Sequence, residues 1–294
     1  MTVQLTDYLT EKRKMINAQL KMYVRDYSTP GRIQDAMLYS IEAGGKRVRP
    51  ILLLATAKAF GASEEKALAV ACSLEMIHTY SLIHDDLPAM DDDDLRRGMP
   101  TNHRKFDEAT AILAGDALLT LSSLIIAEDS HLTDQERVFL IRELSKASGA
   151  KGMVGGQMQD MLSENTEVSL EQLENIHRNK TGQLLRFSII AGAYVGNSTE
   201  ESLEEMTRMG EALGLIFQIQ DDILDVTGDA EVIGKPIGSD EGNAKSTYPK
   251  LLGLEGAKRQ KERYVQEAQD ALRKAGVDQT ILSELIDYLS SRDH

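Results

Sequence analysis

Apolar residues recur every three or four positions along most of this chain, which is the spacing of one face of an α-helix. Leu5, Leu9, Ile16 and Leu20 give such a stripe near the beginning. Runs that alternate apolar and β-branched residues, as strands do, are scarce, and the chain has only six prolines and no tryptophan. This pattern predicts an all-α protein.

Turn residues divide the pattern into separate helices. The first segment ends near Ser28 to Gly31, Gly44-Gly45 stops the second, and Pro50 suits the first turn of the third. Gly61 followed by Ser63 predicts a stop and an N-cap. Further helices are predicted over residues 106–129, 133–148, 151–163, 169–195 and 199–227, with a flexible loop over 228–242 and two shorter helices that end near 289.

The chain has 294 residues, and 41% of them are hydrophobic, which is ample for a large core. It shows no low-complexity linker, no repeat of fixed period and no sharp change in composition. We therefore expect a single-domain bundle of about ten or more helices over residues 1–294.

The net charge of −14 argues against binding of nucleic acid or of an anionic membrane surface, both of which require a basic patch. Cys72 is the only cysteine, so no intrachain disulfide forms and a reducing compartment is indicated. No signal peptide is visible, and the apolar stretch 109–127, which contains Asp116 and serines, is interpreted as too polar to span a bilayer. We expect a cytoplasmic protein with no integral membrane association.

The densest charge lies between residues 84 and 98, where six carboxylates occupy positions 85–94 and Arg96 and Arg97 follow. Like charges this close raise carboxylate pKa values unless a cation neutralises them. A hard divalent ion such as Mg²⁺, bound by carboxylates and substrate phosphates, would do so. The alternative is a solvated acidic loop at a helix end. Because a regular helix would place Asp85 and Asp91 on opposite sides, a break near Pro88 is predicted if both reach one ion.

A second acidic cluster lies about 130 residues further on, at Asp221, Asp222 and Asp225. On a helix Asp221 and Asp225 are about 40° apart around the axis, with Gln218 one turn before them on the same face. An ordinary polar helix face is the alternative interpretation. Taken together, the two clusters predict a polyanion held between them through bridging metal ions.

Several basic residues beside glycine, proline or aspartate turns are candidates for phosphate contacts, although each alone is also typical of a surface charge: Lys46, Arg47, Arg49, Arg96, Arg97, Lys180 and Lys235.

An EF-hand starting at Asp91 is excluded, because Arg96 and Asn102 stand where glycine and glutamate are needed. His84-Asp85 allows a helical metal-dependent phosphohydrolase, but that function leaves the second cluster unexplained.

With both clusters in this order, the sequence resembles the trans-isoprenyl diphosphate synthases of the polyprenyl synthetase family over nearly its whole length. The motifs that carry the resemblance are Gly44 to Pro50, Glu75 to Asp91, Lys180-Thr181-Gly182 and Phe217 to Asp225. The resemblance implies a helical bundle of the isoprenoid synthase type around a central cavity, usually as a homodimer. It also implies the condensation of isopentenyl diphosphate with dimethylallyl or geranyl diphosphate.

The same resemblance implies a role for individual residues. The metal ligands are Asp85, Asp86, Asp91 and Asp221, with Asp222 and Asp225 as further participants, for up to three Mg²⁺ ions or Mn²⁺ in their place. Arg96, Lys180 and Lys235 hold the allylic diphosphate, and Lys46, Arg49, His78 and Arg97 hold isopentenyl diphosphate, with Lys245 as a looser basic match. Thr181 and Gln218 line the reacting carbons and form the catalytic set with Lys180 and Arg96.

Product length is expected to depend on cavity depth. Tyr80 lies about 7.5 Å before Asp85 on the same helix, so its ring, with the adjacent Ser81, would stop growth at the fifteen carbons of farnesyl diphosphate. The alternative role for Tyr80 is core packing. The competing functions are a geranylgeranyl diphosphate synthase of the same fold, a metal-dependent phosphohydrolase, and an inactive subunit that partners an active synthase.

Overall fold

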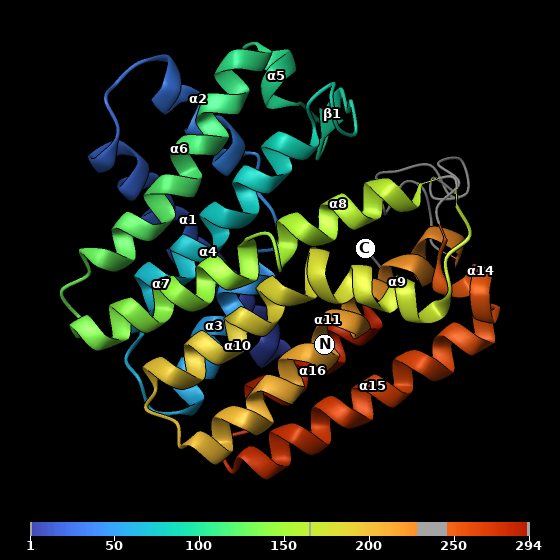
Figure 1. Cartoon of the computed structure of the whole chain (residues 1–294). Coiled ribbons are helices and arrows are strands. Elements are labelled where there is room, and N and C mark those ends of the chain that lie inside the picture. The colour runs from blue at the N-terminus through green and yellow to red at the C-terminus, as the bar shows by residue number, and fades with distance from the viewer. Residues whose placement is uncertain (1, 165, 228–245, 293–294) are drawn as a thin grey trace.

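The computed structural model describes residues 2–164, 166–227 and 246–292, and the chain is an all-α protein, as predicted (Figure 1). The first half contains α1 (Val3–Tyr27), α2 (Arg32–Glu42), α3 (Val48–Ala59), α4 (Glu64–Asp85), α5 (Asn102–Lys105), α6 (Glu108–Ala127) and α7 (Asp134–Ser148). The second half contains α8 (Met153–Ser163), α9 (Leu170–His177), the π-helical turn η1 (Arg178–Gly182), α10 (Gln183–Val195), α11 (Glu200–Thr227), α14 (Tyr248–Leu252), α15 (Leu254–Ala275) and α16 (Thr280–Ser291).

Local capping explains why most predicted helix boundaries are confirmed. The Ser63 side chain accepts from the amide of Lys66 at the start of α4, as its position after Gly61 predicts. Thr133 and Glu136 form a reciprocal capping box at the start of α7.

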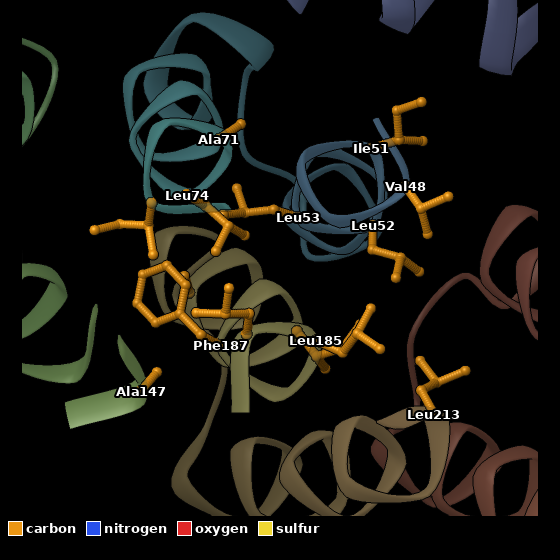
Figure 2. Close-up of a cluster of buried hydrophobic side chains, with 14 of the residues drawn as sticks. Val48, Ile51, Leu52, Leu53, Ala71, Leu74, Ala147, Leu185, Phe187 and Leu213 are labelled. Atoms are coloured by element: carbon orange, nitrogen blue, oxygen red, sulfur yellow. The ribbon is translucent and has the colours of Figure 1, made fainter. Parts of the chain in front are cut away.

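The core is centred on α10, which packs against α3, α4, α7 and α11 and is buried along most of its length. Figure 2 shows Leu53 of α3, Leu74 of α4 and Phe187 of α10 meeting in one apolar cluster. Each such side chain contributes roughly 1.5–3 kcal/mol to the free energy of unfolding when it is fully buried in the folded protein. These helices form a rigid frame that fixes the end of α4 and the start of α10.

The predicted segment 169–195 is helical, but η1 interrupts it as one wider turn. A close helix crossing accompanies this turn, because a Cβ on Gly214 of α11 would lie 2.6 Å from the Cα of Gly182. The crossing brings η1 against α11 one turn before Gln218.

The end of the chain differs from the prediction of two shorter helices. The structure has α14, α15 and α16 there, and α15 is 22 residues long. Its buried face consists largely of alanines, such as Ala257 and Ala268, which give a weak apolar signal.

A small hairpin was also absent from the prediction. β1 (Leu95–Arg96) pairs antiparallel with β2 (Met99–Pro100) through the two-residue turn Arg97-Gly98. Both turn residues have positive φ, 55° and 76°, as in the type I′ turns that suit tight hairpins.

Of the described helices, α6 alone has the length and mean hydropathy, 1.8, that a membrane span requires, and half of that stretch is buried inside the protein. The expectation that this stretch is too polar was therefore wrong as a matter of hydropathy, because one aspartate and two serines barely lower the mean of so many apolar residues.

Candidate active site

The first acidic cluster begins where α4 ends. The helix stops at Asp85, and the amide of Asp91 donates to the Asp85 carbonyl at 2.9 Å across a turn that contains Pro88. The predicted break is confirmed, and it brings Asp91 close enough to raise the pKa of Asp85.

The electrostatics of this turn favour an added cation. Burial raises the pKa of Asp85 to about 6, and Asp91 and Asp86 add to the rise, although Lys180 and Arg96 oppose it. The protein's own cations therefore leave this carboxylate incompletely stabilised in its charged form.

The hairpin delivers Arg96 to the same cluster. Its Nε donates to Asp86 Oδ1 at 2.7 Å, and its Nη2 lies 2.5 Å from the same oxygen. Burial by itself would lower the pKa of Arg96, but the contact with Asp86 outweighs it and the pKa is raised. Asp86, predicted as a metal ligand, thus has one oxygen engaged by a residue predicted to hold diphosphate.

A neighbouring hollow of about 390 Å³ gathers the residues predicted to hold isopentenyl diphosphate: Lys46, Arg49, His78 and Arg97 all line it. Arg97 donates to the Gly44 carbonyl, and a Cβ on Gly45 would lie 2.7 Å from the Arg97 guanidinium. The double glycine therefore makes room for this arginine.

His78 is neutral in this hollow. Burial, reinforced by Arg49 and Arg97, lowers its pKa well below the usual value, and its Nε2 lies 3.5 Å from Arg49 Nη1. Burial also lowers the pKa of Arg49 and of Arg97. A group of cations beside a neutral histidine is suited to an anion with several negative charges.

Arg47 proves to be structural. It is 3% exposed, and its guanidinium contacts Glu75 at 2.5 Å, Asn17 at 2.8 Å and the Ile41 carbonyl at 2.6 Å. These contacts use most of its donors, so its role is to hold the turn at Lys46 and the start of α3, which carries Arg49.

Lys180 projects from η1 toward the first cluster. Its Nζ donates to Asp160 Oδ2 of α8 at 2.6 Å. Burial by itself would lower the pKa of Lys180, but Asp160, Asp85 and Asp91 together raise it. Lys180 is therefore a fixed cation beside the first aspartates.

An apolar cavity of about 550 Å³ extends from these charges into the protein. Asp85, Lys180 and Thr181 line it together with Tyr80, Ser81 and methionines of α8. The Tyr80 ring, 6% exposed, packs edge-on against His84 with ring centroids 5.7 Å apart. Both predicted chain-length residues thus lie in its wall.

The second cluster lies on α11, but its members face different ways. Asp222 is 5% exposed and accepts from the backbone amide of Tyr248 at 2.9 Å. Gln218 lines a small pocket with Asp222 and Lys180, and its Nε2 lies 3.4 Å from Nδ1 of His177. Asp221 instead forms an ion pair with Arg292, beyond α16.

Sequence reasoning missed Asp160, His177 and Arg292. Each meets the site through a contact between distant parts of the chain, and none belongs to a local motif. The predicted ligands Lys235 and Lys245, and the predicted loop over 228–242, lie outside the described residues.

Within the described ranges, no three His, Cys, Asp or Glu side chains are gathered closely enough to hold a metal by themselves. The donors present nevertheless fit a hard divalent ion that takes its other ligands from substrate phosphate. They are carboxylate oxygens, and the pKa of Asp85, raised mainly by burial, indicates that the nearby cations only partly stabilise its charged form.

Comparisons with known proteins agree with this geometry. A family model described as polyprenyl synthetase matches residues 30–288. The chain is 50% identical to the farnesyl diphosphate synthase of Bacillus subtilis (strain 168), with 100% of both chains covered, and 48% identical to that of Geobacillus stearothermophilus, with 99% of each covered. An apo crystal structure of an FPP/GFPP synthase from Zymomonas mobilis aligns with 99% of this chain and 100% of its own, at a TM-score of 0.86 and 36% identity.

Proposed function

The chain belongs to the polyprenyl synthetase family, and we propose that it is a farnesyl diphosphate synthase, which joins isopentenyl diphosphate to dimethylallyl or geranyl diphosphate. One observation carries the proposal. Arg49 and His78 line both the basic hollow and the apolar cavity, so a site for one diphosphate opens directly onto a channel for a hydrocarbon chain. Asp85 and Lys180 lie in the wall of the same cavity and provide the second diphosphate site.

The family is metal-dependent, and Asp85, Asp91, Asp221 and Asp225 are the residues proposed to hold up to three Mg²⁺ ions, or Mn²⁺ in their place. When bound, such ions neutralise charge that develops on a diphosphate leaving group. Asp86 is proposed to take part through the oxygen that Arg96 leaves available. The buried Asp222 is proposed to act indirectly, by holding the chain at Tyr248.

Different residues of the site bind the two substrates. Lys180 and Arg96 bind the allylic diphosphate and stabilise its charge as the allylic C–O bond breaks with both electrons passing to oxygen. Lys46, Arg49 and Arg97 hold isopentenyl diphosphate so that its double bond meets the allylic cation. Thr181 and Gln218 border the reacting carbons.

The last step is the loss of a proton from the joined chain. His78 lies near the isopentenyl site, but its nitrogen faces the Arg49 guanidinium, so protonating it would place two cations together. The departing diphosphate, rich in acceptor oxygens, is the proposed proton acceptor. The apolar lining of the cavity excludes water that would otherwise trap the cation.

Tyr80 and Ser81 are proposed to set the product length from the cavity wall. A product of fifteen carbons follows if the Tyr80 ring stops the growing chain, and a geranylgeranyl product is the alternative if it does not.

A product-sizing assay tests the function. The protein is incubated with Mg²⁺, isopentenyl diphosphate and either allylic substrate, and the products are dephosphorylated and sized. A fifteen-carbon alcohol is expected from both. A twenty-carbon alcohol would indicate the longer-chain synthase, free phosphate without a joined product would indicate a phosphohydrolase, and no turnover would indicate an inactive subunit.

We also propose a homodimer, located in the cytoplasm, that forms through α6. This helix is apolar along its length, yet Ile112, Leu113, Leu119 and Leu124 are 38–58% exposed. A second copy covering this face would remove an apolar surface from water. Leu113→Glu should then convert the dimer to monomer in light scattering, whereas Val138→Glu on α7, where Val138 is 67% exposed, should not.

A further inference from the structure

Arg292, just beyond α16, is built into the second acidic cluster. Its Nη2 donates to Asp221 Oδ1 and to the Phe217 carbonyl at 3.1 Å. Its guanidinium also lies over the Phe217 ring, 3.9 Å from the centroid. The side chain is only 6% exposed, so the ion pair is well shielded from water on the arginine side.

The backbone around Arg292 is fixed as well. Gln220 Nε2, beside Asp221 on α11, donates to the Arg292 carbonyl at 2.7 Å. Lys261 of α15 donates to Gln220 Oε1 at 2.7 Å and to the Ser290 carbonyl at 2.6 Å. Three helices therefore hold the guanidinium against one carboxylate.

This arrangement conflicts with metal binding at Asp221. A guanidinium on one carboxylate oxygen both occupies a lone-pair direction and places a positive charge next to an incoming divalent cation. Arg292 also lines the basic hollow together with Lys46, Arg49 and Arg97, so further positive charges lie on the arginine side of the ion pair.

We propose that Arg292 is a positioning residue that acts as an internal counter-cation for Asp221 when no metal is bound, and that it competes with divalent metal for this carboxylate. The proposal rests on the proposed function, because it takes Asp221 as a metal ligand. It explains how the Asp221 carboxylate stays oriented before metal and substrate arrive.

The test measures metal binding rather than turnover. Mg²⁺ is titrated calorimetrically into the protein with saturating inorganic diphosphate, and the melting temperature is measured with a chelator and with Mg²⁺ plus diphosphate. Arg292→Gln should lower the Mg²⁺ concentration at the midpoint of the titration by about three- to tenfold. This is the range expected when one charge-assisted hydrogen bond no longer competes with the metal for Asp221. It should lower the melting temperature more in chelator than in the loaded state.

Arg292→Lys keeps the positive charge but loses the planar guanidinium with its several donors. Its Mg²⁺ titration midpoint should therefore lie between those of the wild type and Arg292→Gln. Lys261→Met, which loosens the anchor without touching Asp221, should shift the midpoint in the same direction by a smaller factor. The matched control is Arg208→Gln, which removes an exposed arginine that pairs with Glu205 on the same helix and should change neither reading.

A Mg²⁺ midpoint in Arg292→Gln at or above the wild-type value would overturn the proposal. If that variant does not fold, midpoints at or above the wild-type value in both Arg292→Lys and Lys261→Met would overturn it equally. A wild-type protein that binds no Mg²⁺ with diphosphate would instead contradict the proposed function, so the two failures are distinct.

Discussion

Replacing Asp85 by asparagine should stabilise the metal-free protein at neutral pH while it abolishes prenyl transfer. Burial is the main reason that the pKa of Asp85 rises from 3.8 to about 6 in the folded protein. Between these values the folded state holds the proton more tightly than the unfolded chain does. The free energy of unfolding therefore falls as the pH rises through this window, and the loss is complete above about pH 6.

The size of the effect follows from the shift. The rise in pKa from 3.8 to about 6 corresponds to roughly 3 kcal/mol of unfolding free energy, and partial access of water to Asp85 reduces this to about 1–2 kcal/mol. For a chain of this length that predicts a rise in melting temperature of about 2–8 °C for Asp85→Asn near pH 7.5. Near pH 4, where the wild-type carboxyl is also neutral in the folded state, the two proteins should melt within about 1 °C of each other.

Thermal unfolding in chelator across this pH range measures the difference directly. Asp134→Asn, which changes a carboxylate whose side chain is 96% exposed, is the control and should show no such pH dependence. Asp85 would not destabilise the folded protein in this way if Asp85→Asn melted below the wild type near neutral pH, or if the difference between the two melting temperatures did not grow as the pH rose.

Three further substitutions test the rest of the site. Tyr80→Ala should give products of twenty carbons or more, and an unchanged fifteen-carbon product in the sizing assay would show that the ring is not the stop. Asp160→Asn should lower kcat/KM for geranyl diphosphate about tenfold, because Lys180 loses the negative charge of the partner that orients it at 2.6 Å, and an unaltered kcat/KM would contradict that role. Gly45→Ala should raise KM for isopentenyl diphosphate about tenfold with little change in kcat, since a Cβ would displace the Arg97 guanidinium. A tenfold lower kcat with an unchanged KM would argue against a role of Arg97 in binding isopentenyl diphosphate.

The helical architecture could be predicted because its signals are local. Ser63 and Thr133 cap helices with side chains that stand within three residues of the amides they bind. The break after Asp85 was likewise predictable from Pro88 and from the spacing of the aspartates. In both cases the physical cause lies within one or two turns of the chain.

The remaining features depend on contacts that no local pattern records. The hairpin that carries Arg96 and Arg97 is only two residues long on each strand, too short to show an alternating pattern. Asp160 meets Lys180 across 20 residues, and Arg292 meets Asp221 across 71, so only the folded chain brings them together.

If one cavity joins two diphosphate substrates, the stoichiometry of a single reaction is fixed. With Mg²⁺, geranyl diphosphate and isopentenyl diphosphate, we expect one diphosphate released for each isopentenyl unit consumed, and one fifteen-carbon product for each diphosphate released. Diphosphate release that continues without isopentenyl diphosphate, or without a joined product, would contradict it.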